Sequence, residues 1–427
     1  MGRWKTVLSR WIYAAAVAVK PLITRVIPLS RLQGAKQKVF QAGITEQSRT
    51  QALDPLLPDG VNLVGYLRAQ FGLGQSARLM AEGLEASSYP YCALDLKAGA
   101  GIRHGDHQLD GKIANQAKYN INLLHIMPGG SFQVMLMQLP EGTLSGRYNI
   151  GYWMFELENI PEDWKTSFQY VNEVWTPSEF ASEAFRKHSP VPVYTMPYGI
   201  TAEPDRRLSR KDFSLPEDQF LFLMMFDSGS TSERKNPRDA IQAFRMAFAN
   251  HPKASLVIKV NNASQEDLDK LRRWLEGLEN VYLLQGTYPK SKVYSLISLC
   301  DVFVSLHRSE GFGLPMAEAM LLKTPCIATD YSANRDFMNG RTACLVRAAM
   351  VDVALENHPV YTRGNKWAQP DIKQAADYMR RLMEDQTYYK EIQTEAYRFI
   401  TQVYSLEACA RRIDQRIQAI LSENIKK

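Results

Sequence analysis

The chain has 427 residues, of which 45% are hydrophobic and 22% charged, and its formal net charge is +6. These ordinary proportions exclude a disordered or fibrous protein, and the length predicts about two or three globular domains. A multispan membrane protein is also excluded. The longest apolar run near the start, Trp11–Val19, has nine residues, whereas a membrane-spanning helix needs about 20.

The positive charge is concentrated in residues 1–50, which hold nine Lys or Arg and one acidic residue. The remaining chain has 42 basic and 44 acidic residues and is nearly neutral. A nucleic-acid-binding protein would carry its charge on the folded domain, so we expect no nucleic-acid partner. The five cysteines are odd in number and scattered, with no Cys-x-x-Cys pair. This pattern favours a reducing cytoplasm over a disulfide framework or a zinc site.

Residues 1–50 are predicted to form a basic amphipathic extension. Its apolar residues recur at steps of three and four, so a helix would place them on one face: Trp4, Leu8, Trp11, Ala15, Ala18 and Leu22. Such a helix is typical of a segment that lies on an anionic membrane surface, and we assign that role to residues 1–45. The alternatives are a signal peptide with Trp11–Val19 as its apolar region, and a helix that packs on the folded body.

Residues 60–200 alternate short apolar runs with amphipathic helical patterns such as Gln75–Glu85 and Glu179–Lys187. The runs predict six strands: Asn62–Tyr66, Tyr91–Leu96, Asn120–Ile126, Asn149–Met154, Glu173–Thr176 and Val191–Met196. This alternation is typical of a parallel sheet covered by helices on both faces. We therefore predict a doubly wound, Rossmann-like N-terminal domain, followed by a polar linker over Thr201–Leu215.

Two features of this first domain point to a ligand. Gly72-x-Gly74-x-x-Ala77 resembles a dinucleotide-binding fingerprint, with Asp95 21 residues beyond Gly74. A nicotinamide-dependent oxidoreductase is thus an alternative function, although five residues separate these glycines from the strand that the fingerprint requires directly before them. His125 and Glu156 lie near the ends of two strands. In a parallel sheet both would face the cleft, as candidate catalytic residues. For His125 the alternative is a hydrogen-bonded structural histidine.

Residues 215–400 repeat the alternation and predict a second Rossmann-like domain. Its strands are Phe220–Phe226, Ser255–Val260, Val281–Leu284, Val302–Leu306, Cys326–Thr329 and Cys344–Val346. Further helical patterns lie around Ile372–Asp385 and Leu406–Leu421. We expect two α/β domains facing a cleft, with the ligand at the carboxyl ends of the strands. Residues 401–427 are expected to form a C-terminal helix that packs back toward the N-terminal domain.

A strand-to-helix turn, Ser230-Thr231-Ser232-Glu233-Arg234-Lys235-Asn236-Pro237, follows the strand Phe220–Phe226. Arginine presents a planar fork and lysine a compact charge, so Arg234 and Lys235 are suited to clamp a diphosphate. The alternative is a surface turn with two solvated cations.

A second turn, Ser309-Glu310-Gly311-Phe312-Gly313-Leu314-Pro315-Met316-Ala317-Glu318, follows the strand Val302–Leu306. Its glycines and Pro315 mark the start of a helix, where free N–H groups and the helix dipole favour an anion. Glu310 and Glu318 are eight positions apart and are placed to reach different hydroxyls of one ligand. The alternative is a pair of solvated acids.

These two turns, together with Thr324-Pro325-Cys326-Ile327-Ala328-Thr329-Asp330-Tyr331-Ser332, resemble glycosyltransferase family 4. The members are retaining enzymes with the GT-B fold, in which two Rossmann-like domains face a cleft. The resemblance runs from about residue 62 to residue 420. Three further segments resemble a bacterial polysaccharide-type branch: Tyr148-Asn149-Ile150-Gly151-Tyr152-Trp153, Glu173-Val174-Trp175-Thr176-Pro177-Ser178 and Trp367-Ala368-Gln369-Pro370-Asp371.

The resemblance implies roles for the matching positions. Glu310 would hold the donor sugar and support the transition state, Glu318 would bind the ribose, and Lys235 with Arg234 would stabilise the departing nucleoside diphosphate. Sugar and diphosphate oxygens would bind backbone N–H groups at Gly311, Phe312, Gly313 and Leu314. Many members have an arginine five residues before the lysine, where this chain has Ser230.

Other implied positions are less closely matched. Gln285, in the stretch Gln285–Tyr288, would lie near the nucleobase. Gly72 and Gly74 would belong to a flexible loop that approaches the donor phosphates and the acceptor. His125 and Glu156 are the two candidates for the N-domain contact near the reacting carbon of the sugar.

The resemblance implies transfer of a hexosyl residue from GDP-mannose or a UDP-hexose to a glycan or lipid-linked glycan acceptor, in cell-surface polysaccharide synthesis. No cofactor and no divalent metal are expected. The expected location is cytoplasmic, at the inner face of the cell membrane. The alternatives are the NAD(P)-dependent oxidoreductase and a non-catalytic partner at the membrane that keeps the sugar-nucleotide fold.

Overall fold

The computed structural model describes residues 53–98, 102, 104–353, 355, 360–361 and 364–425. The predicted membrane-binding extension over residues 1–50 lies outside this part of the chain. None of the described helices combines the length and apolar character that crossing a bilayer requires. All five cysteines are buried free thiols.

The N-terminal domain is built on a six-stranded sheet whose paired strands all run parallel, in the order β2-β1-β3-β4-β5-β6. The strands are β1 (Val61–Gly65), β2 (Tyr91–Asp95), β3 (Ile121–His125), β4 (Tyr148–Tyr152), β5 (Glu173–Thr176) and β6 (Val193–Thr195). The α-helices between them are α3 (Gly72–Glu85), α4 (Gly130–Leu136) and α5 (Glu179–Arg186), and 3₁₀ helices span Asp110–Lys112 and Glu162–Tyr170.

The C-terminal domain has a second parallel sheet, in the order β12-β11-β10-β7-β8-β9. Its strands are β7 (Phe220–Asp227), β8 (Ala254–Asn261), β9 (Val281–Gln285), β10 (Val302–Ser305), β11 (Cys326–Thr329) and β12 (Cys344–Val346). Between them lie α6 (Ser232–Lys235), α7 (Pro237–Phe248), α8 (Gln265–Leu275), α9 (Lys290–Leu299) and α10 (Leu314–Leu321), and the chain continues into α11 (Ile372–Glu384), α12 (Gln386–Val403) and α13 (Leu406–Ile425).

The strand order of each sheet reverses at one point. In the C-terminal sheet the reversal lies between β7 and β10, and in the N-terminal sheet it lies between β1 and β3. The connections leave a reversal point in opposite directions, which opens a crevice at the carboxyl ends of the strands where ligands bind in such folds. The topology therefore places one crevice in each domain.

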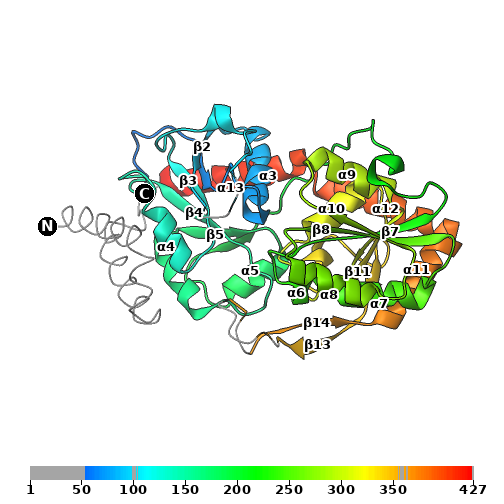
Figure 1. Cartoon of the computed structure of the whole chain (residues 1–427). Helices are drawn as coiled ribbons and strands as arrows, with labels where there is room; N and C mark the ends of the chain where they lie inside the picture. The colour runs from blue at the N-terminus through cyan, green and yellow to red at the C-terminus, as the bar shows by residue number, and fades with distance from the viewer. Residues whose placement is uncertain are drawn as a thin grey trace.

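The two domains lie side by side, and α13 crosses from the C-terminal domain to pack along the N-terminal one (Figure 1). Arg416 on α13 bonds the buried carboxylate of Glu173 on β5, with an Nε–Oε1 distance of 3.1 Å. A Cβ at Gly83 of α3 would lie 2.9 Å from Cys409 Sγ, so these two helices are in close contact. Buried apolar residues of both domains and of α13 form one continuous cluster, which fixes the domains relative to one another.

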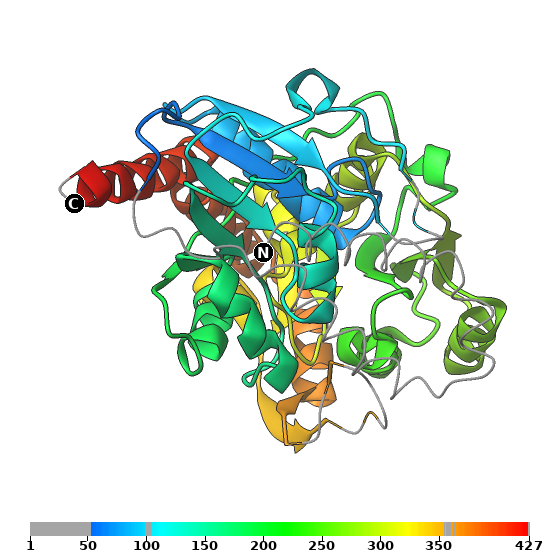
Figure 2. The same ribbon diagram turned by 90° about the vertical axis from the view of Figure 1, so that its left-hand side faces the viewer.

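A two-stranded antiparallel hairpin lies outside both main sheets. It is formed by β13 (Ala348–Asp352) and β14 (Lys366–Pro370). Viewed from the side of the N-terminal domain, the hairpin projects at the bottom, while α13 lies beside the strands of that domain (Figure 2). The sequence patterns did not predict these two strands, because neither has the apolar run of a buried parallel strand.

All twelve predicted strands are present, with ends shifted by two residues at most. One prediction for the first domain is wrong: Gly72 and Gly74 do not form a loop, because α3 begins at Gly72. A Cβ at Gly74 would lie 2.2 Å from the carbonyl oxygen of Ala69. Gly74 thus allows the helix to pack closely against the preceding chain. This packing explains the glycine, and a role in phosphate binding is not needed to explain it.

Candidate active site

The candidate site lies at the reversal point of the C-terminal sheet. The chain leaves β7 through α6, which carries Arg234 and Lys235, and it leaves the neighbouring β10 through the turn that carries Glu310. Asn236 adopts a left-handed conformation (φ 52°) between α6 and α7, and its side-chain Nδ2 donates to the Leu306 carbonyl at 2.9 Å. This bond ties the two turns together.

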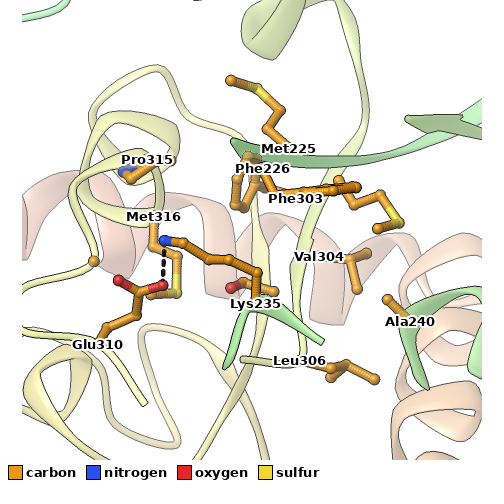
Figure 3. Close-up of a pocket in the computed structure, with 13 residues that line it drawn as sticks. Met225, Phe226, Lys235, Ala240, Phe303, Val304, Leu306, Glu310, Pro315 and Met316 are labelled. Carbon is orange, nitrogen blue, oxygen red and sulfur yellow. Dashed lines mark hydrogen bonds and ion pairs between the residues drawn. The ribbon is translucent and has the colours of Figure 1, made fainter. Parts of the chain in front are cut away.

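Lys235 and Glu310 form an ion pair in a narrow pocket (Figure 3). Lys235 Nζ is 2.5 Å from Glu310 Oε1. The ends of β7 and β10 and the start of α10 form the apolar wall of the pocket, with Phe226, Leu306 and Met316 among the lining residues. The two turns predicted to bind the ligand, at Lys235 and at Glu310, therefore lie together, close enough to contact one small ligand.

Arg234 binds the other oxygen of Glu310 from a buried position. Its Nη1 is 3.1 Å from Glu310 Oε2 and donates to the Ser309 carbonyl at 2.8 Å. Burial alone would raise the pKa of Glu310, but the charges of Lys235 and Arg234 outweigh it and hold that pKa at about 2. Glu310 is therefore ionised at any physiological pH, and its charge balances one of the two cations.

Glu156 joins this cluster from the N-terminal domain. It follows β4, and its Oε1 is 3.4 Å from Arg234 Nε. Its backbone carbonyl accepts a hydrogen bond from Ser309 Oγ. The candidate site is thus shared between the domains, with two cations and two carboxylates in contact.

The turn before α10 presents a row of backbone donors. Within the described residues, the N–H groups of Gly311, Phe312, Gly313 and Leu314 donate to no partner. Gly313 has a φ of 92°, which favours glycine. A Cβ at Gly311 would lie 3.2 Å from the Phe155 carbonyl, and Phe312 packs between the rings of Tyr198 and Phe337. A row of free donors at a helix start is suited to bind an anion.

Glu318 occupies a separate position one turn into α10. It is 2% exposed, and its Oε1 accepts from Lys290 Nζ at 2.8 Å and from Tyr294 Oη at 3.3 Å. Burial and the charge of Glu318 raise the pKa of Tyr294, which keeps the phenol protonated as a donor. Glu310 and Glu318 therefore have different partners within the C-terminal domain.

His307 lies beside the site, although it was not among the residues predicted from sequence patterns. It is fully buried beside Glu310, and burial lowers its pKa, so the ring is neutral. Its Nε2 lies 3.0 Å from Asn334 Oδ1 and 3.3 Å from the Tyr331 carbonyl, both of them acceptors. Its Nδ1 lies 3.2 Å from the Ser305 carbonyl, so both ring nitrogens have a backbone oxygen within hydrogen-bond distance. A histidine two residues after an apolar strand was the available signal.

His125 is buried at the other reversal point, at the end of β3. Ser76 Oγ lies 2.7 Å from its Nε2, and its ring stacks on Tyr152 at 4.9 Å. Burial lowers the pKa of His125 to about 4, so the ring is neutral. Within the described residues it forms no hydrogen bond or ion pair with the Lys235–Glu310 cluster. It is linked to the Phe312 turn through Tyr198, which bonds Ser76.

The remaining predicted residues lie outside the cluster. Ser230 donates through Oγ to the Asp227 carbonyl at 3.1 Å, in the turn before α6. Gln285 is exposed at the end of β9. The next carbonyl, of Gly286, accepts from Lys259 Nζ, and burial lowers the pKa of Lys259 to about 8. In the part of the chain that the structure describes, no three His, Cys, Asp or Glu side chains gather as metal ligands would.

Comparisons with known proteins agree with this architecture. Residues 205–399 match the family model described as glycosyl transferases group 1. Sucrose-phosphate synthase from Thermosynechococcus elongatus superposes with a TM-score of 0.61 and 15% identity, over 86% of this chain and 100% of that one. HepE from Anabaena, solved with UDP and glucose, superposes with a TM-score of 0.59 and 15% identity, over 84% of this chain and 100% of that one. A glycosyltransferase from Rickettsia africae superposes with a TM-score of 0.59 and 13% identity, over 85% of this chain and 99% of that one. No curated protein matches in sequence.

The class that the fold defines is GT-B: two Rossmann-like α/β domains, each built on a six-stranded parallel sheet, as in the solved structures above. The part of the chain that carries the Lys235–Glu310 cluster is the part that matches glycosyl transferases group 1.

Proposed function

We propose that the protein is a retaining glycosyltransferase that moves a hexosyl residue from a nucleotide-diphosphate sugar to a glycan or lipid-linked glycan. The observation that carries the proposal is the contact of Lys235 and Glu310, at 2.5 Å, at the reversal point of the C-terminal sheet. The match to glycosyl transferases group 1 over residues 205–399 supports it. UDP is bound in the structures of HepE, which supports a UDP-hexose donor, with GDP-mannose as the other candidate.

The proposed chemistry is charge separation at the bond between sugar and diphosphate. As this bond breaks, negative charge grows on the diphosphate and the sugar carbon becomes oxocarbenium-like. Lys235, Arg234 and the backbone donors at 311–314 are already arranged to stabilise that negative charge, and preorganised donors cost little reorganisation in the transition state. Metal-independent transfer is part of the proposal, with these groups as the counter-charge of the diphosphate.

The carboxylates of Glu310 and Glu318 would bind two different parts of the donor. Glu310 would accept hydrogen bonds from the hydroxyls of the sugar, and Glu318 would accept them from the ribose. The acceptor hydroxyl would attack from the side on which the diphosphate leaves, and a diphosphate oxygen would take its proton. This order of events retains the configuration at the sugar carbon.

Glu310→Ala and Lys235→Ala should each lower turnover at least tenfold, measured as release of nucleoside diphosphate from UDP-glucose or GDP-mannose, because each removes transition-state stabilisation worth roughly 1.4 kcal/mol or more. Glu310→Gln keeps the shape of the side chain and removes its charge. It should also lower turnover, and it is less prone to misfold than Glu310→Ala. The matched control is Lys270→Ala, which breaks an exposed pair with Glu266 on α8. Wild-type rates in both site variants would refute the assignment.

We further propose that residues 1–45 hold the protein at an anionic membrane surface. The support is the amphipathic pattern and the excess of eight positive charges in residues 1–50. Deletion of residues 1–45 should release the protein from vesicles that contain anionic lipid, while nucleotide-sugar binding persists. Equal sedimentation of the full and shortened chains with these vesicles would contradict an interfacial role.

A further inference from the structure

The β13–β14 hairpin is anchored beside the candidate site. Trp367 on β14 is 1% exposed, and the guanidinium carbon of Arg308 lies 5.3 Å from the centre of its ring. Gln369 accepts from Arg308 Nη2 at 2.7 Å and donates to Asp239 Oδ2 at 2.6 Å. Arg308 is two residues before Glu310, so the hairpin shares its support with the turn that carries this carboxylate.

The same segment also contacts the N-terminal domain. The backbone N–H of Asn159 donates to Asn365 Oδ1 at 3.1 Å, and Asn365 Nδ2 donates to the Asn159 carbonyl at 3.2 Å. Val353, Tyr361 and Trp367 belong to the apolar cluster that contains N-terminal-domain residues of the loop after β4. The hairpin therefore holds the loop on which Glu156 lies.

Tyr361 makes the contact with the site itself. Its hydroxyl donates to Glu156 Oε1, the oxygen that is 3.4 Å from Arg234 Nε. Arg234 in turn binds Glu310 Oε2. Burial, together with the charge of Glu156, raises the pKa of Tyr361, so the phenol keeps its proton. A continuous series of polar contacts thus runs from the hairpin to Glu310.

We propose that Tyr361 is a positioning residue for diphosphate binding, acting on Arg234 through Glu156. This inference rests on the proposed function. It concerns a residue supplied by the hairpin, outside both Rossmann-like sheets and outside the segment of residues 309–318.

The hydrogen bond from Tyr361 would change how strongly Glu156 holds Arg234. Arg234 is shared between Glu156 and Glu310, and a diphosphate must compete with both carboxylates for it. The hydrogen bond from Tyr361 takes up part of the negative potential of Glu156 and weakens its hold on Arg234. The Arg234 Nε is buried and forms no hydrogen bond within the described residues, so its ion pair with Glu156, at 3.4 Å, is a loose contact that a change at Glu156 can shift.

The test is calorimetric titration of the full chain with UDP, GDP and inorganic pyrophosphate. Tyr361→Phe keeps the ring and removes the hydroxyl. We expect it to weaken nucleoside diphosphate binding about tenfold, the effect of losing one hydrogen bond to a charged group. The control is Tyr397→Phe, a partly exposed tyrosine on α12, which should bind as the wild type does. Thermal melting checks that both variants are folded.

A double-mutant cycle with Glu156→Gln separates positioning from a merely structural role. Glu156→Gln removes the competing charge and should tighten diphosphate binding, and adding Tyr361→Phe to it should change the affinity less than twofold. An equal loss in both backgrounds would overturn the inference, since Tyr361 would then act without Glu156. Wild-type affinity in Tyr361→Phe would overturn it and leave the proposed function intact. Failure of the wild type to bind any of the three probes would overturn both.

Discussion

Gly72 and Gly74 show how one residue type in one motif can serve different purposes. Both lie in the first turn of α3, but their surroundings differ. A Cβ at Gly74 would meet the Ala69 carbonyl at 2.2 Å and the Tyr66 carbonyl at 2.9 Å, whereas a Cβ at Gly72 would meet nothing within 4 Å. Gly74 is therefore required by close packing of backbone against backbone, and Gly72 is not.

Gly74→Ala should lower the free energy of unfolding by roughly 1–3 kcal/mol, because the new methyl group forces the backbone apart. Gly72→Ala is the matched variant and should leave stability unchanged or raise it by up to about 1 kcal/mol, since alanine is the better helix former. Urea denaturation measures both. Equal stability of the two variants would contradict the close approach at Gly74.

Some residues of the site could be predicted from a local sequence pattern, and others could not. Arg234, Lys235, Glu310 and Glu318 lie in the turns that follow predicted strands or in the helices that these turns begin, so parallel topology brings them to one edge. Lys290, Asn334 and Tyr361 reach the site through contacts between distant segments, and a single sequence has no local pattern for these. His307 is an intermediate case, because its position after a strand was visible but its burial against Glu310 was not.

At the scale of elements, the start of α5 and the 3₁₀ helix Ala333–Asp336 join the two domains by direct contacts. The backbone N–H of Glu179 donates to Asp336 Oδ2 at 2.6 Å, and Ser178 Oγ donates to the Gly311 carbonyl at 2.7 Å. Burial raises the pKa of Asp336 from an ordinary value of 3.8 to about 6, and the charges of Glu179 and Glu183 add to this. The folded protein thus favours the protonated form of Asp336 relative to the unfolded chain.

The sign of the pH dependence follows from that raised pKa. The contribution of Asp336 to stability is fully present below about pH 4 and is lost as the pH rises through about 6. Asp336→Asn keeps the acceptor and removes the ionisation. It should therefore match the wild type below pH 4 and exceed its stability above pH 6, on the order of 1 kcal/mol after allowance for partial exposure.

Denaturation curves at several pH values test this prediction, with Asp218→Asn at an exposed position as the control. A constant difference between Asp336→Asn and the wild type across the pH range would show that the ionisation of Asp336 is not the cause.

The elements that were predicted and those that were not differ in their hydrophobic pattern. Buried parallel strands such as β7 and β8 are nearly continuous apolar runs, so their existence follows from composition alone. β13 reads Ala-Ala-Met-Val-Asp and β14 reads Lys-Trp-Ala-Gln-Pro, and both depend on pairing with each other. The 3₁₀ helix Glu162–Tyr170 similarly depends on tertiary contacts, since Trp164 and Phe168 bury their rings in the N-terminal core.

At the scale of the whole molecule, alternation of strands and helices was sufficient to predict two Rossmann-like domains. It could not predict how the domains are held together. The structure shows three kinds of connection: α13 along the N-terminal domain, the β13–β14 hairpin at the loop after β4, and direct hydrogen bonds between the domains such as Ser178 to Gly311. Each depends on residues more than 100 positions apart in the sequence.

The ligand that the protein binds can be tested directly. In the proposed function the cleft binds the diphosphate of an activated sugar through Lys235, and it does not bind a nicotinamide nucleotide through Gly72 and Gly74. Thermal unfolding of the full chain with each ligand reports binding, because a ligand at about 100 times its dissociation constant stabilises the folded state by about 2.7 kcal/mol.

The decisive measurement is thermal unfolding of the wild type and Lys235→Ala with UDP-glucose, GDP-mannose or NADH. We predict that at least one of the two nucleotide sugars raises the melting temperature of the wild type and that Lys235→Ala loses most of this rise, while NADH has no effect on either. Stabilisation by NADH with none from the nucleotide sugars, or an undiminished rise in Lys235→Ala, would contradict diphosphate binding at Lys235.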